Sequence, residues 1–126
     1  MDTHDRLIQA LTDPSVYAHP TSEITVLQTH ISWIVLTGPY AYKIKKPVNF
    51  GFVDFSTLAK RHFFCQEELR LNRRLAPHLY LDVVAIAGTS ERPRVHGQGA
   101  PIEYAVHMVQ FAQDTLLSHL IDAGQL

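Results

Sequence analysis

Residues 40–47 read as a β-strand, yet this segment, YAYKIKKP, carries three of the four lysines in the chain. Because side chains alternate along a strand, Ala41, Lys43 and Lys45 share one face, and the aromatic and aliphatic residues between them share the other. We expect the aromatic and aliphatic face to pack inward. The lysine face then lines a polar site, and a phosphate is the anion that suits such lysines.

A helical pattern follows at residues 56–76, and its spacing places a carboxylate among apolar side chains. The apolar face predicted from the periodicity contains Phe64, Cys65, Leu71 and Leu75. Glu68 lies among these residues at helical spacing, and an unpaired carboxylate there would be costly to desolvate. The sequence therefore predicts that Glu68 has a cationic partner, and Lys43 is the candidate.

The neighbouring Glu67 is interpreted differently, because Arg70 and Arg74 follow it at i+3 and i+7. This spacing is typical of an ordinary solvated ion pair. Glu68 is thus the carboxylate of interest.

Length and composition indicate a single globular unit. With 126 residues, of which 46% are hydrophobic, the chain can bury one modest core, and we expect one domain over residues 1–126. A net charge of −1 argues against disorder and against a generic nucleic-acid binder. Residues 43–74 nevertheless hold eight Lys or Arg against three acidic residues, and five of these bases, Lys60, Arg61, Arg70, Arg73 and Arg74, fit the solvated face of a helix.

The cysteine and histidine content, the N-terminus and the apolar runs argue against a disulfide, a metal site, export and a membrane span. The single cysteine permits no disulfide within the chain, and the eight histidines lack His-x-x-x-His spacing, so no metal site is expected. The N-terminus lacks the features of a signal peptide, and no apolar run is long enough to cross a membrane. We therefore expect a cytoplasmic protein.

The coarse order of elements is a short helix, two strands, the lysine-bearing strand, a long helix and two further strands. The expected bounds are helix 3–12, strands 24–28, 33–37, 79–87 and 102–109, and an amphipathic run at 114–123. Residues 88–101 are expected to form a loop. Asp54 and Ser56 are the candidate caps of the long helix.

Several of these segments together resemble a known family. They are THISW at 29–33, AYKIKKP at 41–47, GFVDFSTL at 51–58 and EELRLNRRLAP at 67–77. Over most of residues 20–126 the chain resembles the N-terminal part of bacterial aminoglycoside-phosphotransferase-like proteins, kinase-fold enzymes often fused to a P-loop ATP-binding domain.

The resemblance implies an α+β fold: a protein-kinase-like N-terminal lobe with a five-stranded antiparallel sheet and one long helix between the third and fourth strands. Sheet and helix would span residues 23–111. It also implies that Lys43 holds the α and β phosphates of ATP and that Glu68 positions Lys43. Lys45 is the alternative phosphate lysine.

Further ligand contacts are expected on the same grounds. Adenine would lie against Ala41 and form backbone hydrogen bonds at the hinge. The expected hinge residues are Val109, Gln110 and Phe111. Thr29 and Ser32 are candidate phosphate contacts, because the turn between the first two strands has none of the glycines of a kinase phosphate loop.

The sequence lacks the catalytic half of such an enzyme. It contains no His-x-Asp…Asn catalytic loop and no Asp-Phe-Gly-like metal motif, which the resemblance places in a second lobe together with the Mg²⁺ ligands and the acceptor pocket. The chain alone is expected to contribute no catalytic residue and to need a C-terminal lobe, or a partner chain, to complete the cleft.

Three hypotheses follow for function. The first is the ATP-binding lobe of a small-molecule kinase, inactive on its own. The second is a non-catalytic interaction module that retains this lobe and docks through an apolar surface. The third is a nucleic-acid-binding domain using the basic segment 43–74, which is disfavoured because the aromatics there belong to the predicted inward face.

Overall fold

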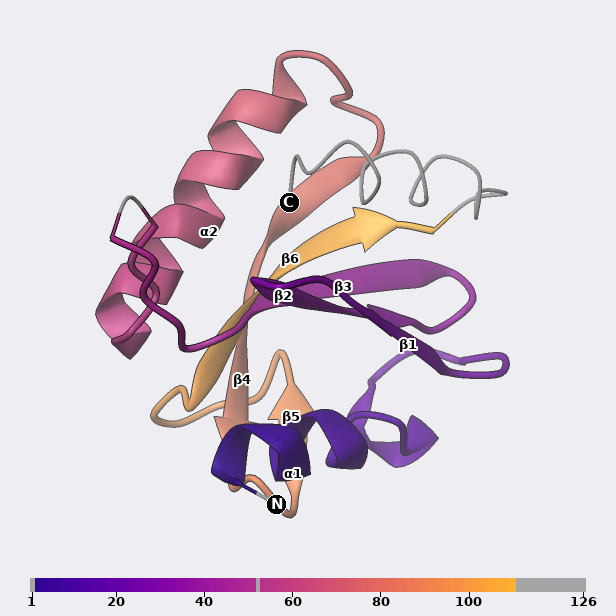
Figure 1. The fold of residues 1–126 in the computed structure, drawn as a ribbon. Helices are drawn as coiled ribbons and strands as arrows, with labels where there is room; N and C mark the ends of the chain where they lie inside the picture. The colour runs from indigo at the N-terminus through magenta and orange to yellow at the C-terminus, as the bar shows by residue number, and fades with distance from the viewer. Residues whose placement is uncertain (1, 52, 111–126) are drawn as a thin grey trace.

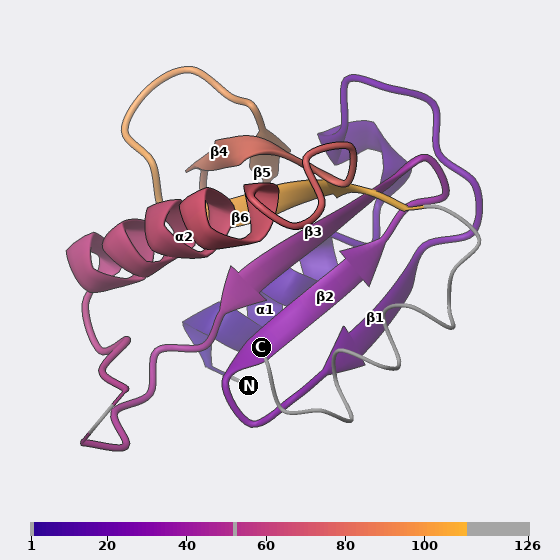
Figure 2. The ribbon, with the colours of Figure 1, turned by 90° about the horizontal axis from the view of Figure 1, so that it is seen from above.

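The protein forms an α+β fold in which a curled antiparallel sheet carries helices on both faces (Figures 1 and 2). The structure is a computed structural model and describes residues 2–51 and 53–110. The strands are β1 (Thr25–Gln28), β2 (Ser32–Leu36), β3 (Tyr40–Lys45), β4 (Tyr80–Gly88), β5 (Pro93–Val95) and β6 (Glu103–Val109). Their order in the sheet is β1-β2-β3-β6-β4-β5, so β6 lies between β3 and β4.

The sheet has six strands, so the prediction of five is wrong. The additional strand, β5, lies within the segment predicted to be a loop and pairs with the end of β4, with Val95 opposite Ile86 and Pro93 opposite Gly88. Periodicity does not reveal a strand of three residues. Proline is tolerated as its first residue because β5 is an edge strand.

Both faces of the sheet are buried. On one face Tyr42 and Ile44 join a core cluster with Leu7 and Ile8 of helix α1 (Thr3–Ala10). On the other face Ala41 joins a second cluster with Cys65 of helix α2 (Leu58–Arg73). The predicted alternation along β3 is thus confirmed, but its lysine face is also covered, by α2.

Helix α2 lies between the third and fourth strands, as predicted, but is shorter than residues 56–76. Its N-cap is Thr57, whose side chain accepts a hydrogen bond from the amide of Lys60 at 3.2 Å. The predicted caps are therefore wrong. The Asp54 carboxylate instead accepts a hydrogen bond from the amide of Ser56 at 3.0 Å and pairs with the Lys60 ammonium at 2.5 Å.

The face that α2 turns to the sheet also differs from the prediction. Arg61 and Cys65 are its buried residues, whereas Leu71 and Leu75 are 49% and 87% exposed. Leu75 follows the last helical residue, so the periodicity extended the apolar face beyond the end of α2. The sequence analysis placed Arg61 on the solvated face of the helix, but its guanidinium pairs with Glu103 inside the protein.

The N-terminal segment closes the opposite side of the sheet. Asp2 caps α1 by accepting a hydrogen bond from the amide of Asp5 at 2.8 Å. The helix ends at Ala10, two residues before the predicted end, and Asp13 then caps a short 3-10 turn, Pro14–Val16. Leu11 and Val16 complete the core beneath the sheet. The amphipathic run at 114–123 lies outside the described residues.

Candidate functional site

The strand β3 and the helix α2 bring Lys43 and Glu68 into contact. The Lys43 ammonium forms an ion pair with Oε2 of Glu68, and the two side chains are 1% and 11% exposed. The pair that the sequence predicted therefore exists. Cys65, one turn before Glu68, is fully buried against the sheet, which fixes this face of the helix.

A second lysine shares the same carboxylate. Lys45 Nζ donates to Oε1 of Glu68 at 2.7 Å, and its side chain is 4% exposed. Its ammonium also lies 5.0 Å from the centre of the Phe55 ring, within the range of a cation–π interaction. Periodicity could not separate Lys43 from Lys45, because both project from one face of β3.

Burial and the neighbouring charges have opposite net effects on the pKa values of Glu68 and Lys43: Glu68 stays ionised more easily, and Lys43 loses its proton more easily. Burial opposes ionisation of Glu68, but Lys43 and then Lys45 outweigh it and hold the pKa of the carboxyl below its usual value. Burial lowers the pKa of Lys43, and Glu68 opposes that shift only in part. We treat Lys43 and Glu68 as a charged pair, because each lies against the other and the carboxyl is the stronger acid. The cluster then carries two positive charges and one negative charge, a net charge of +1.

Ser32 lies beside this cluster and has no hydrogen-bond partner for its hydroxyl among the residues that the structure describes. It is opposite Lys45 in the β2–β3 register and fully buried. Thr29 is engaged differently, because its Oγ1 accepts hydrogen bonds from the amides of Ile31 at 3.2 Å and Ser32 at 3.0 Å. Thr29 thus fixes the turn, and phosphate contacts from either hydroxyl stay predictions.

The predicted adenine contacts lie at the far end of β3. Ala41 is fully buried, opposite Met108 of β6. The amides of Val109 and Gln110 donate to the carbonyls of Leu79 at 2.8 Å and Pro39 at 3.1 Å. Two of the predicted hinge residues therefore use their N–H groups inside the fold, and the third, Phe111, lies outside the described residues.

Sequence reasoning missed a second buried ionic cluster. Arg61 Nε donates to both oxygens of Glu103 at 3.2 and 3.1 Å, and its Nη1 donates to the carbonyl of Phe55 at 2.8 Å. Glu103 is 1% exposed and also contacts His4 Nε2 at 3.1 Å. Partners separated by 42 and 99 positions leave no periodic signal in the sequence.

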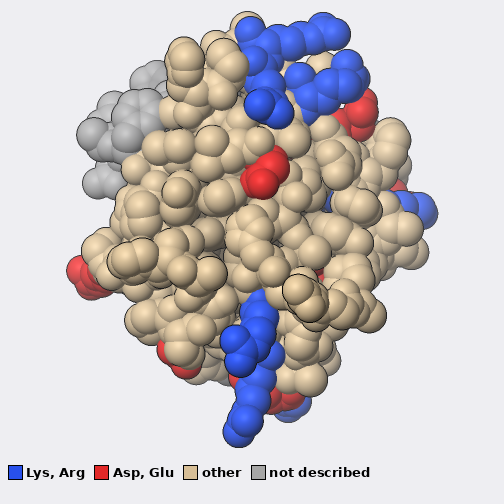
Figure 3. Space-filling view, turned by 180° about the vertical axis from the view of Figure 1, so that it is seen from behind, with Lys and Arg blue, Asp and Glu red and all other residues tan. Residues whose placement is uncertain are grey.

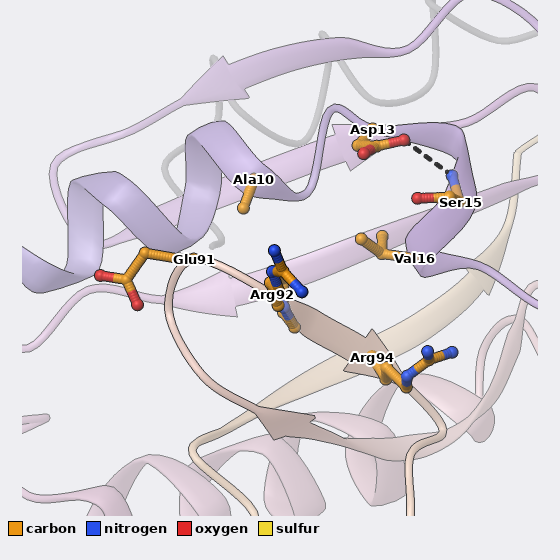
Figure 4. A pocket seen from close by; sticks show the side chains of 8 residues that line it. Ala10, Asp13, Ser15, Val16, Glu91, Arg92 and Arg94 are labelled. Carbon is orange, nitrogen blue, oxygen red and sulfur yellow. Dashed lines mark hydrogen bonds between the residues drawn. The ribbon is translucent and has the colours of Figure 1, made fainter.

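Two cavities lie away from the lysine cluster. One, of about 290 Å³, is bordered by α1, the 3-10 turn and β5, with Arg92 and Arg94 among its lining residues (Figure 4). The other, of about 440 Å³, is lined by His4, Arg61 and Glu103 among others. Neither includes a residue predicted to bind nucleotide.

The basic segment 43–74 does not form a continuous surface stripe. Lys43, Lys45 and Arg61 are buried in ion pairs, so the prediction of a solvated Arg61 is wrong. Arg70 does pair with Glu67, at 2.8 Å, as predicted. The side of the molecule opposite to that in Figure 1 is mostly uncharged, with Lys and Arg gathered mainly at two separate ends (Figure 3).

Comparison with known proteins gives relatives but no function. The chain is 34% identical over 115 residues to proteins of Mycobacterium tuberculosis (strain ATCC 25618 / H37Rv) and Mycobacterium bovis (strain ATCC BAA-935 / AF2122/97), both named as uncharacterised. The match covers 89% of this chain but 22% of each relative. No protein-family model matches the sequence, and no solved structure gives a significant match.

Two further features concern the residues that the structure describes. None of the helices found there is long and apolar enough to span a bilayer. Over residues 2–51 and 53–110, no three His, Cys, Asp or Glu side chains gather as a metal site would require.

Proposed function

We propose that this chain is the ATP-binding, kinase-like N-terminal lobe of a small-molecule phosphotransferase resembling the aminoglycoside-phosphotransferase-like family. The observation that carries the proposal is the buried Lys43–Glu68 ion pair between β3 and α2. The pair joins the middle of a strand to the middle of a helix, where the resemblance expects a phosphate-binding lysine and the glutamate that positions it.

The net charge of the cluster supports an anionic ligand. Two buried ammonium groups share one carboxylate, so one positive charge lacks a partner among the described ion pairs. An uncompensated buried charge is unfavourable, and a ligand phosphate would neutralise it. Lys43 is 1% exposed, so a phosphate reaches it only when the ammonium turns away from Glu68.

Phosphate transfer requires groups that this sequence does not supply. The Mg²⁺ ligands, the catalytic base and the acceptor pocket would come from another part of the polypeptide or from a partner chain. The length of the relatives leaves room for this arrangement, because the chain spans only 22% of each of them. The residues of this chain would hold the nucleotide and orient its phosphates.

Titration with ATP tests the proposal. The 126-residue chain should bind ATP weakly, because the proposal assigns the other side of the cleft to residues outside this sequence. Lys43→Met should weaken binding by at least ~10-fold through the loss of a charge-assisted hydrogen bond. Lys60→Met is the matched control, since the Lys60 side chain is 48% exposed and pairs with Asp54. Equal ATP affinity in the wild-type and Lys43→Met chains would refute the proposal.

A non-catalytic interaction module is the second candidate, and one observation favours it. Among the described residues, four large apolar side chains are 49% exposed or more: Phe50, Phe63, Leu71 and Leu75. Exposed apolar side chains are common at docking surfaces. A folded, monodisperse chain that binds no nucleotide would favour this second function.

A further inference from the structure

We propose that Lys45 is a positioning residue that holds Glu68 on the sheet while Lys43 turns towards the phosphates of a polyphosphate ligand. The inference rests on the proposed function, since it assumes that the cluster receives an anion. It assigns different tasks to two lysines that the sequence could not distinguish.

The geometry separates the two lysines by the oxygen that each contacts. Lys43 pairs with Oε2 of Glu68, whereas Lys45 donates to Oε1 at 2.7 Å. Departure of the Lys43 ammonium therefore leaves Glu68 with a hydrogen-bonded cation. Without Lys45, the same departure would leave a carboxylate that is 11% exposed with no cation beside it.

Lys45 has contacts that fix it in this place. The Lys45 side chain is 4% exposed, and its ammonium lies 5.0 Å from the centre of the ring of Phe55, a residue of the segment just before α2. On the helix side, Asn72 Nδ2 donates to the backbone carbonyl of Glu68 at 2.8 Å, within α2. The contact between Lys45 and Glu68 thus joins two well-packed elements.

The charges favour the same division of tasks. With both lysines protonated the cluster carries +1, and a phosphate that pairs with Lys43 leaves the Lys45–Glu68 pair neutral. If Lys45 were lost, Glu68 and a ligand phosphate would compete for the single ammonium of Lys43. Binding would then require protonation of Glu68 or exposure of its charge to water.

The test measures binding of inorganic tripolyphosphate and ATP to the 126-residue chain by calorimetry, near neutral pH and at low ionic strength. The variants are Lys43→Met, Lys45→Met and the double variant Lys45→Met/Glu68→Gln, with Lys60→Met as control. Circular dichroism checks that each is folded. The double variant removes the opposing charges together, so it stays informative if Lys45→Met is unstable.

We expect Lys43→Met to weaken tripolyphosphate binding by at least ~10-fold and Lys45→Met by roughly 3- to 10-fold. The double variant should bind at least about 3-fold more tightly than Lys45→Met, because no carboxylate then competes for Lys43. A spectroscopic signature accompanies these values. At saturating ligand, the ¹³C resonance of the Glu68 carboxyl should stay at the ionised position in wild type and move towards the protonated position in Lys45→Met.

Failure of the inference differs from failure of the proposed function. If Lys43→Met abolishes binding but Lys45→Met binds as wild type does, the positioning role is overturned and the nucleotide site stands. The same conclusion follows if Lys45→Met binds as weakly as Lys43→Met and Glu68→Gln does not restore affinity, because Lys45 would then contact the phosphate directly. If wild type binds neither ligand, or if Lys43→Met binds as wild type does, both proposals are overturned.

Discussion

Two buried ionic clusters both contact Phe55, and they differ in charge balance. Phe55 connects them, because its carbonyl accepts a hydrogen bond from Arg61 and its ring lies near the ammonium of Lys45. The first cluster holds Arg61 against Glu103. The second holds two lysines against Glu68.

The Arg61–Glu103 cluster is balanced and saturated. Trp33 Nε1 donates to His4 Nδ1 at 3.2 Å, and because an indole N–H only donates, Nε2 of His4 carries the proton that Glu103 accepts. His4 is therefore neutral, and the one guanidinium matches the one carboxylate. Glu103 thereby links α1, α2 and β6, which is what a structural cluster requires.

The lysine cluster is unbalanced and unsaturated. It carries a net charge of +1, and the buried hydroxyl of Ser32 beside it has no partner among the described residues. Unbalanced charge destabilises a fold unless a ligand offsets it. The comparison teaches that burial of charge does not distinguish the two clusters, whereas the excess of positive charge does, and that excess is the reason for proposing an anion site at the lysine cluster.

The largest expected effect comes from breaking the balanced cluster. Glu103→Ala leaves the Arg61 guanidinium buried without its carboxylate, and arginine cannot lose its proton to relieve this. We expect the free energy of unfolding to fall by ~3–5 kcal/mol. Urea denaturation measures it. The double variant Arg61→Met/Glu103→Leu should lose less unfolding free energy than Glu103→Ala, because it leaves no unpaired charge. A loss under about 1 kcal/mol for Glu103→Ala would contradict the structural role of the cluster.

Glu68→Gln should lower the free energy of unfolding by about 2–3 kcal/mol, less than Glu103→Ala, although it removes a carboxylate from two cations. Burial already lowers the pKa of Lys43, and loss of Glu68 removes a charge that opposed this shift, so Lys43 can become neutral. Urea denaturation at matched pH compares the two variants. A larger loss for Glu68→Gln than for Glu103→Ala would reverse the ranking of the clusters.

The sequence predicted part of this contrast. The alternation of Lys43 and Lys45 with apolar residues placed both on one face of β3, and the apolar neighbours of Glu68 identified it as the carboxylate that needed a cation. Both inferences depend on local periods that a strand or a helix imposes on the chain.

The features that the sequence did not predict depend on tertiary geometry or on very short elements. The contact between Arg61 and Glu103 spans 42 positions, and no helical or strand period relates the two. Leu71 is exposed near the end of α2 and Leu75 lies beyond its last residue, and periodicity encodes neither the end of the helix nor the part of it that the sheet covers. Strand β5 is too short for an alternating pattern to be recognised.

Acid should weaken the lysine cluster. The folded-state pKa of Glu68 lies below its ordinary value of 4.5, so its stabilising contribution is complete above that value and is lost as the pH falls through the folded pKa. The difference in unfolding free energy between wild type and Glu68→Gln should therefore narrow as the pH falls below 4.5. A difference that stays constant over this range would show that the lysines do not hold Glu68 ionised.

The smallest effect is expected for the carboxylate next to Glu68. Glu67 pairs with Arg70 at 2.8 Å on the outer face of α2, where water and salt screen both charges. Glu67→Gln should leave the urea midpoint unchanged within error, at low and at high salt. Two adjacent glutamates of one helix would then differ only in the face on which they lie, so any stability change in Glu68→Gln can be assigned to the buried lysines. A loss in Glu67→Gln that matches that of Glu68→Gln would instead assign both effects to helix propensity.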